Sequence, residues 1–158
     1  FDNIFKKIEE AALSVVRRSE SFSESLKPNT SIDWNNIDVL LGDSFGEMYF
    51  YLTLCDHVVA GGGFWHTGAH NIIEQLQLHK PVTVGPEIWT IKFPALQAEE
   101  AGLVKVVKDP VELKSNLCLF LENNIANKIS KNKFERFLKV YAGASNRTLE
   151  MLESKGLI

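Results

Sequence analysis

The sequence has little cysteine and no excess of positive charge, and each shortage excludes a class of protein. Its 158 residues carry 17 basic against 20 acidic side chains, for a formal net charge of -3. Because no positive surplus is available to neutralise a polyphosphate backbone, nucleic acid is excluded as a partner. Cys55 and Cys118 stand far apart inside apolar runs. We expect two buried thiols, in a reducing cytoplasmic setting, rather than a disulfide or a metal pair.

Long apolar runs are also missing. No stretch approaches the roughly 20 residues that span a bilayer, and the longest one, Met48 to Cys55, has the length of a core helix. The N-terminus lacks the basic region and the continuous apolar region of a signal peptide. We therefore expect this chain by itself to be soluble. Its size, with 45% hydrophobic and 23% charged residues, predicts a single domain over residues 1–158.

Apolar strands alternate with helical segments along most of the chain. The patterns predict strands over 13–17, 37–41, 57–60, 82–84 and 103–107, and helices over 1–12, 47–54, 71–78 and 94–101. Strands that are apolar throughout, separated by helices, indicate a parallel sheet covered on both faces. The prediction is a doubly wound α/β fold, followed by helices from Pro110 to the end. Since such domains usually begin with a strand and this chain begins with a helix, we expect a fragment.

The first candidate site is the loop Gly42–Glu47, between a predicted strand and a predicted helix. It fits the G-x-S-x-G pattern of a nucleophile elbow and resembles the serine block of GDSL-type esterases, with Ser44 as nucleophile. Both hydrolase classes take a histidine base from late in the chain, whereas the last histidine here is His79. The alternative is structural: Gly46 permits a tight turn while Asp43 or Ser44 caps the helix.

The second candidate site is the loop Gly61–Glu74. Glycines directly after a buried strand let the backbone approach a ligand, and a helix beginning near Asn71 directs N–H groups at an anion such as a phosphate. Glu74 falls in the first turn of that helix, where its carboxylate can accept hydrogen bonds from a ribose diol. The alternative is a capping interaction between Asn71 and Glu74.

Metal and dinucleotide sites are disfavoured in this second loop. His66, His70 and Glu74 are spaced by four residues, but such ligands converge only on a helix, and Gly68 and the preceding glycines make this stretch a loop. His70 is better assigned to the edge of a ligand pocket or to a structural hydrogen bond. The G-x-G-x-x-G fingerprint is absent, which disfavours NAD. A third loop, 85–90, carries Trp89, either for stacking on a base or sugar or for packing.

Together the three loops resemble Kdo (3-deoxy-D-manno-octulosonic acid) transferases. The block 43–48 is similar to their D-T-M-G-E-M motif, and 61–74 is similar to G-G-S-x-x-x-x-G-G-H-N-x-x-E-P. Lys80-Pro81 with Gly85-Pro86 resembles G-K-P-V-x-x-G-P. Order and spacing agree over about Val39 to Gly102, and the H-N-x-x-E element is the most specific part.

The resemblance implies the C-terminal, Rossmann-like half of an inverting GT-B glycosyltransferase. The donor is CMP-Kdo, the acceptor is a lipid A precursor (lipid IVA) in lipopolysaccharide biosynthesis, and no metal or other cofactor is implied. The catalytic base, the membrane anchor and most of the acceptor site belong to an N-terminal domain that this chain lacks. The full-length protein would act at the cytoplasmic face of the bacterial inner membrane, whereas this fragment alone would be inactive. By motif match the donor contacts are Gly46, Glu47, Gly62, Gly63, Asn71 and Glu74, with His70 as a further candidate.

Several positions depart from the family pattern. Phe64, Ala69 and Gln75 replace the usual serine, second glycine and proline, and an arginine-containing segment expected before Phe1 is missing. These changes bear on the shape of the sugar pocket more than on the nucleotide site. The open alternatives are another GT-B enzyme that uses a UDP-sugar, either a glycosyltransferase or an epimerase, the serine esterase described above, and a Rossmann-like module without enzymatic activity.

Overall fold

The computed structural model of the chain describes residues 1–123, 129–141 and 143–157. It contains two compact units, Phe1–Tyr51 and Leu52–Ile158, and each is described by itself below. Helix α3 (Met48–Leu54) begins in the first unit and ends in the second. Within the described residues, no helix combines the length and the apolar character needed to cross a bilayer.

The first unit is built on a pair of parallel strands. Its elements in chain order are α1 (Asp2–Glu10), β1 (Val15–Arg17), α2 (Arg18–Ser21), the 3-10 helix η1 (Trp34–Asn36) and β2 (Val39–Leu41). Val15 pairs with Val39 and Arg17 with Leu41. The Asp38 carboxylate accepts hydrogen bonds from the backbone N–H and the hydroxyl of Ser14, at 2.9 and 2.8 Å. These bonds join the two strands at their amino-terminal ends.

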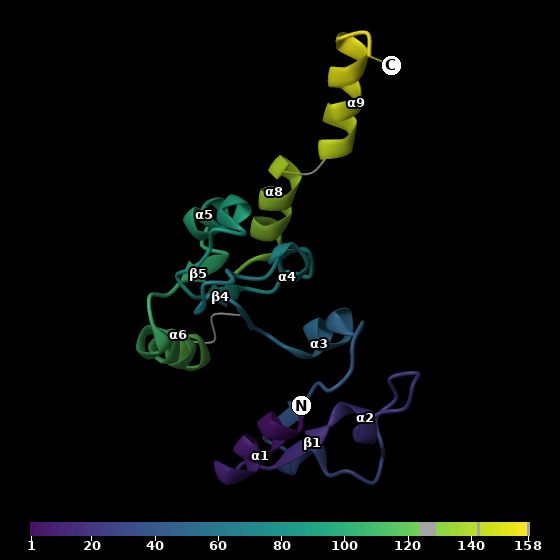
Figure 1. The fold of residues 1–158 in the computed structure, drawn as a ribbon, viewed down its shortest axis with the longest axis vertical. Coiled ribbons are helices and arrows are strands. Elements are labelled where there is room, and N and C mark those ends of the chain that lie inside the picture. The colour runs from purple at the N-terminus through teal and green to yellow at the C-terminus, as the bar shows by residue number, and fades with distance from the viewer. Residues whose placement is uncertain (124–128, 142, 158) are drawn as a thin grey trace. The chain divides into compact units, whose positions relative to one another are not determined.

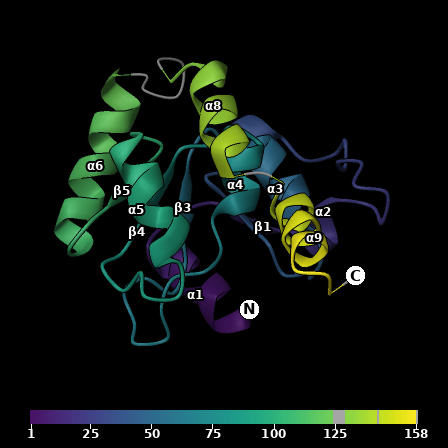
Figure 2. The same cartoon turned by 90° about the horizontal axis from the view of Figure 1, so that it is seen from above.

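The second unit contains a sheet of three parallel strands in the order β3-β4-β5. Its elements are β3 (Val58–Ala60), α4 (Ile73–Gln77), β4 (Val82–Val84), α5 (Lys92–Glu100), β5 (Val104–Val106), α6 (Pro110–Asn123), α8 (Lys131–Tyr141) and α9 (Ala144–Ser154). Figures 1 and 2 both show the strands between α6 on one side and α4 with α8 on the other. This layering is that of an α/β fold.

Strand β4 lies at the centre of the core because both of its faces are covered. Side chains alternate across a strand, so Val82 and Val84 share one face and join a buried cluster with Ala95, Ala98 and Phe134. Thr83, which is also fully buried, lies on the opposite face. Its hydroxyl bonds to His57 Nε2 and to Asn116 Oδ1 of α6, each at 2.8 Å. A fully buried polar side chain is tolerated here because it has two partners.

The predicted element types are largely confirmed, and the differences are local. The strand at Val82–Val84 has the expected bounds, whereas α4 is only five residues long and α2 occupies residues for which no helix was predicted. The helical prediction for residues 124–128 lies outside the described residues. The burial prediction for Cys118 is wrong, because this thiol is exposed on α6, while Cys55 is half-buried and both are free. Burial raises the pKa of the Cys55 thiol.

Candidate functional site

The loop that follows β3 folds back on itself. The backbone N–H of His70 donates to the carbonyl of Gly61 at 3.0 Å and closes the neck of the loop. Within it, the N–H of Trp65 donates to the Gly62 carbonyl and the N–H of Gly68 to the Trp65 carbonyl, both at 3.1 Å. The loop therefore has a defined backbone at the carboxyl end of a parallel strand, where open α/β sheets bind ligands.

Close packing explains why Gly62 and Gly63 are glycines. Gly62 has φ +82°, and a Cβ there would overlap the carbonyl oxygen of Gly68. A Cβ at Gly63 would lie 2.7 Å from the backbone nitrogen of Gly85, in the loop that follows β4. The absence of side chains thus lets the two loops meet backbone to backbone. This requirement is structural, and a role for the same glycines in donor binding stays a prediction.

Asn71 and Glu74 flank the beginning of α4. Asn71 Oδ1 accepts a hydrogen bond from the N–H of Ile73 at 3.1 Å, so the side chain does cap the helix, with Ile73 rather than Glu74 as its partner. Glu74 is half-buried in the first turn. Among the described residues no hydrogen bond or ion pair engages its carboxylate. The carboxylate is therefore available to accept hydrogen bonds from a ligand, whereas Asn71 retains only part of its hydrogen-bonding capacity.

His70 is exposed and lies against the neck of the loop. Its ring is close to both Gly61 and Gly62, since a Cβ at Gly62 would be 3.2 Å from His70 Cδ2. The described residues contain no cluster of three or more histidine, cysteine, aspartate or glutamate side chains able to hold a metal ion. The structure thus brings Gly62, Gly63 and His70 together on one loop, with Asn71 and Glu74 directly after it.

Gly46 and Glu47, the remaining predicted donor contacts, lie in the first unit. Gly46 is exposed with φ +81° and has open space around it, as expected of a residue that permits a turn. The Glu47 carboxylate forms an ion pair with Arg18 and accepts hydrogen bonds from the Ser44 hydroxyl and from the Tyr51 hydroxyl, the latter at 3.4 Å. Glu47 therefore fixes the loop after β2 through contacts within its own unit.

Arg18 is a buried residue that the sequence analysis did not single out. Only 8% of it is exposed, and its Nη2 also donates to the carbonyl of Ser23 at 3.4 Å. No described group accepts a hydrogen bond from its Nε. A buried arginine requires a carboxylate partner, and Glu47 supplies it. The feature of the sequence that could have indicated Arg18 is the pair of consecutive arginines, Arg17 and Arg18, at the end of a predicted strand.

Asp43 and Ser44 depart from the capping roles considered for them. Asp43 accepts hydrogen bonds from the backbone N–H and the hydroxyl of Ser19, at 2.9 and 2.6 Å, and lies 3.7 Å from the Arg17 guanidinium. Burial acts to raise the pKa of Asp43, but the bonds from Ser19 and the charge of Arg17 outweigh it and lower that pKa. Ser44 donates to a carboxylate, and residues 1–51 contain no histidine. The first unit therefore offers no imidazole base for a serine hydrolase.

Comparison with known proteins gives a consistent result. No protein-family model matches the chain. The chain is 32% identical over 153 residues, or 97% of its length, to the 3-deoxy-D-manno-octulosonic acid transferase of Bordetella pertussis. It is 26% identical over 139 residues, or 86% of its length, to the enzyme of the same name from Haemophilus influenzae. It spans 34% and 32%, about a third, of these two proteins.

A solved structure supports the fold. The C-terminal CMP-Kdo binding domain of WaaA from Acinetobacter baumannii superposes with a TM-score of 0.70 at 22% sequence identity, covering 87% of this chain and 67% of that one. The α/β fold with parallel strands is thereby confirmed. The resemblance inferred from the three loops is confirmed as well, since this chain is related over nearly its whole length to about a third of a Kdo transferase.

Proposed function

We propose that this chain is the donor-binding part of a glycosyltransferase that transfers Kdo from CMP-Kdo to a lipid A precursor. The observation that carries the proposal is the 32% identity to a Kdo transferase over 97% of the chain. The H-N-x-x-E element supports it, because it begins at His70, which closes the loop after β3 at the carboxyl end of a parallel sheet. The enzymatic activity belongs to the full-length protein.

In this proposal the second unit binds the nucleotide. Glu74, with a half-buried carboxylate that no described residue engages, accepts hydrogen bonds from the ribose hydroxyls. The side-chain amide of Asn71 donates to the ligand while its oxygen caps α4. Gly62 and Gly63 let the phosphate approach the backbone, and His70 lies at the edge of the site. Gly46 and Glu47 shape the loop after β2, with Arg18 holding Glu47 in place.

The remainder of the proposal concerns the whole enzyme. Transfer proceeds with inversion and without a metal, and its base lies outside this chain. Most of the acceptor site, and the contact with the cytoplasmic face of the inner membrane, belong to the rest of the protein. This division leaves the chain with donor recognition and without catalysis of its own.

Titration calorimetry of the chain with CMP and with UMP tests the proposal. We expect CMP to bind more tightly, whereas a GT-B enzyme that uses a UDP-sugar would prefer UMP. Glu74→Ala should weaken CMP binding about 10- to 100-fold, because hydrogen bonds to a charged group contribute about 1.5–3 kcal/mol. Glu100→Ala, at an exposed position on α5, should leave CMP affinity unchanged.

Two results would overturn this assignment. Tighter binding of UMP than of CMP would reject Kdo transfer in favour of a uridine nucleotide donor. An unchanged CMP affinity for Glu74→Ala, together with a lowered melting temperature, would make Glu74 a structural residue of α4. Hydrolysis of p-nitrophenyl acetate that is lost in Ser44→Ala would establish the esterase instead.

A further inference from the structure

A hollow of about 390 Å3 lies beside the loops at the carboxyl ends of β3, β4 and β5. Its volume falls within the range of about 300–1,000 Å3 that is typical of small-molecule sites. The lining residues are Phe64, Trp65 and His66 after β3, Pro86 and Glu87 after β4, and Lys108, Asp109 and Pro110 after β5. None of them is among the predicted donor contacts. The proposed donor site therefore leaves this hollow unexplained.

Two of the three loops that form the hollow are fixed to one another. The N–H of Glu87 donates to the Gly63 carbonyl at 2.9 Å, and the Glu87 carbonyl accepts from the N–H of Ala69 at 2.8 Å. The backbones of Gly63 and Gly85 approach too closely for a Cβ on either residue. The third loop is held by α6, whose residue Glu112 donates its N–H to Asp109 Oδ1 at 2.7 Å. The walls are thus preorganised, which lowers the entropic cost of binding.

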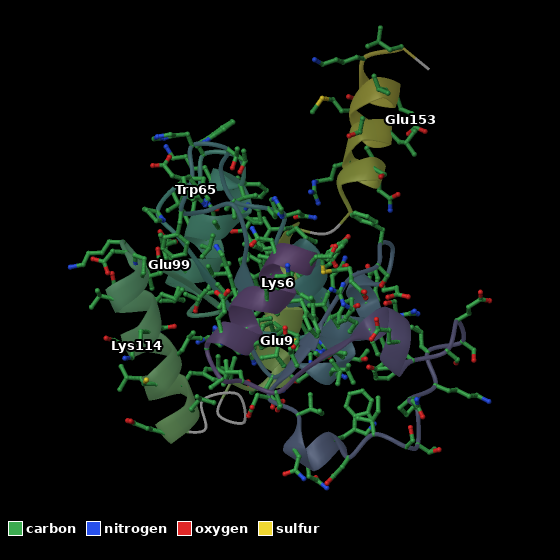
Figure 3. All side chains as sticks on the ribbon, turned by 60° about the horizontal axis from the view of Figure 1, so that its bottom comes forward. Lys6, Glu9, Trp65, Glu99, Lys114 and Glu153 are labelled. Carbon is green, nitrogen blue, oxygen red and sulfur yellow. The ribbon has the colours of Figure 1, made fainter. Side chains whose placement is uncertain are left out.

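The hollow offers an aromatic face together with groups of both charges. Trp65, labelled in Figure 3, is 73% exposed although its backbone is held in the closed loop. Among the described residues, no hydrogen-bond or ion-pair partner engages the Glu87 carboxylate or the Lys108 ammonium group. A large exposed indole beside an unpaired acceptor and an unpaired donor suits a ligand with one apolar face and a polar rim.

A neutral sugar ring has this combination of surfaces. The C–H groups on one face of a pyranose pack on an indole, and its hydroxyls both donate and accept hydrogen bonds. A carboxylate accepts from such hydroxyls and an ammonium group donates to them. A phosphate or another strong anion fits less well, because Glu87 and Asp109 line the same hollow as Lys108 and His66.

We infer that this hollow binds a neutral pyranose ring, which stacks on Trp65 and is hydrogen-bonded by Glu87 and Lys108. Its place in the reaction rests on the proposed function, under which the ring belongs to the acceptor. The binding of the sugar itself does not depend on that function. Sugar binding and nucleotide binding can therefore be tested separately on the same protein.

NMR of the indole N–H groups measures both events at once. The chain has three tryptophans, Trp34, Trp65 and Trp89, and substitution to phenylalanine one at a time assigns their signals. We expect methyl α-D-glucopyranoside to shift the Trp65 signal saturably at millimolar concentration and to leave Trp34 in place. Sorbitol, an acyclic polyol, should have no such effect. CMP should bind without moving the Trp65 signal.

Variants separate the hollow from the donor site. Glu87→Gln and Lys108→Met should each weaken sugar binding about 3- to 10-fold, the loss expected for one hydrogen bond, and should leave CMP affinity unchanged. Trp89→Ala removes another exposed indole, which is 63% exposed and does not line the hollow, and this variant should bind the sugar normally.

Each outcome decides the inference. A Trp65 signal that does not respond to the glucoside overturns it, as does an equal response to sorbitol. Competition between CMP and the sugar for the Trp65 signal would assign the hollow to the donor site and also overturns it. Sugar binding in a chain that fails to bind CMP would leave the inference standing and reject the proposed function.

Discussion

The loops after β2 and after β3 follow parallel strands in the same way, yet they are fixed by different forces. In the first unit, charged side chains hold the loop: Arg18 pairs with Glu47, and Ser19 bonds to Asp43. In the second unit, the backbone holds it, through glycines that allow two loops to touch. Loops at candidate sites can therefore be preorganised either by buried ion pairs or by the absence of side chains.

These two ways of fixing a loop place different requirements on the sequence. A buried ion pair costs desolvation and is strongly destabilised when one partner is lost. A glycine contact costs chain entropy and tolerates no larger residue. The loop after β2 should therefore be sensitive to loss of charge, and the loop after β3 to added volume.

The largest effect is expected for Arg18→Ala. It leaves the Glu47 carboxylate, with only 17% of its side chain exposed, without its cation, which should cost about 3 kcal/mol in the free energy of unfolding. Urea denaturation followed by Trp34 fluorescence, in a background with Trp65 and Trp89 replaced by phenylalanine, measures it. The control is Glu20→Ala, which breaks an ion pair with Arg17 in the same unit, where the Glu20 side chain is 75% exposed, and it should cost about 0.5 kcal/mol. Equal losses in the two variants would contradict the structural role of Arg18.

A somewhat smaller effect is expected for Gly62→Ala. The new Cβ meets the Gly68 carbonyl and the backbone has φ +82°, so strain and overlap together should cost about 2–3 kcal/mol. Gly46→Ala has nearly the same φ, +81°, and nothing within 4 Å. It should therefore cost only about 1 kcal/mol. Urea denaturation measures both variants. Similar losses in the free energy of unfolding would mean that the positive φ alone, and not the close contact with Gly68, requires glycine at position 62.

The smallest effect is a difference in pH dependence between the units. Burial lowers the pKa of His57 from 6.5, so the unfolded chain takes up a proton first and the second unit loses stability as the pH falls below 6.5. The pKa of Asp43 lies below 3.8, so its contribution to the first unit is present above that pH and is lost only below it. Thermal unfolding from pH 8 to pH 3 should show the second unit weakening first. His57→Gln should remove the loss near pH 6.5, and persistence of that loss would assign it to another group.

Local patterns in the sequence predicted most of the fold. The run Val82–Val84 is apolar at both ends and lies between helical segments, and it forms the fully buried strand expected of it. Helix α1 follows the spacing of Phe1, Ile4, Phe5 and Ile8. These signals depend on neighbours along the chain. The helix beginning at Asn71 was overestimated, because its pattern extends past the five residues that form α4.

The candidate site was predicted in part. The glycine loop and the H-N-x-x-E element were visible as motifs, and the structure brings Gly62, Gly63 and His70 onto one loop. The partner of Glu47 was not visible, since Arg18 is 29 positions away in the printed sequence. Nor was the hollow beside Trp65 visible, because its walls come from three separate loops.

The amino-acid pattern alone is sufficient for the α/β class, the order of the elements and the resemblance to Kdo transferases, because all three follow from short-range periodicity and motif spacing. The folded chain was needed to establish which charges pair, that Cys118 is exposed, and that Gly63 meets Gly85. Those outcomes depend on contacts between residues distant in sequence, whose distances are set by the packing of strands and helices and not by local propensity.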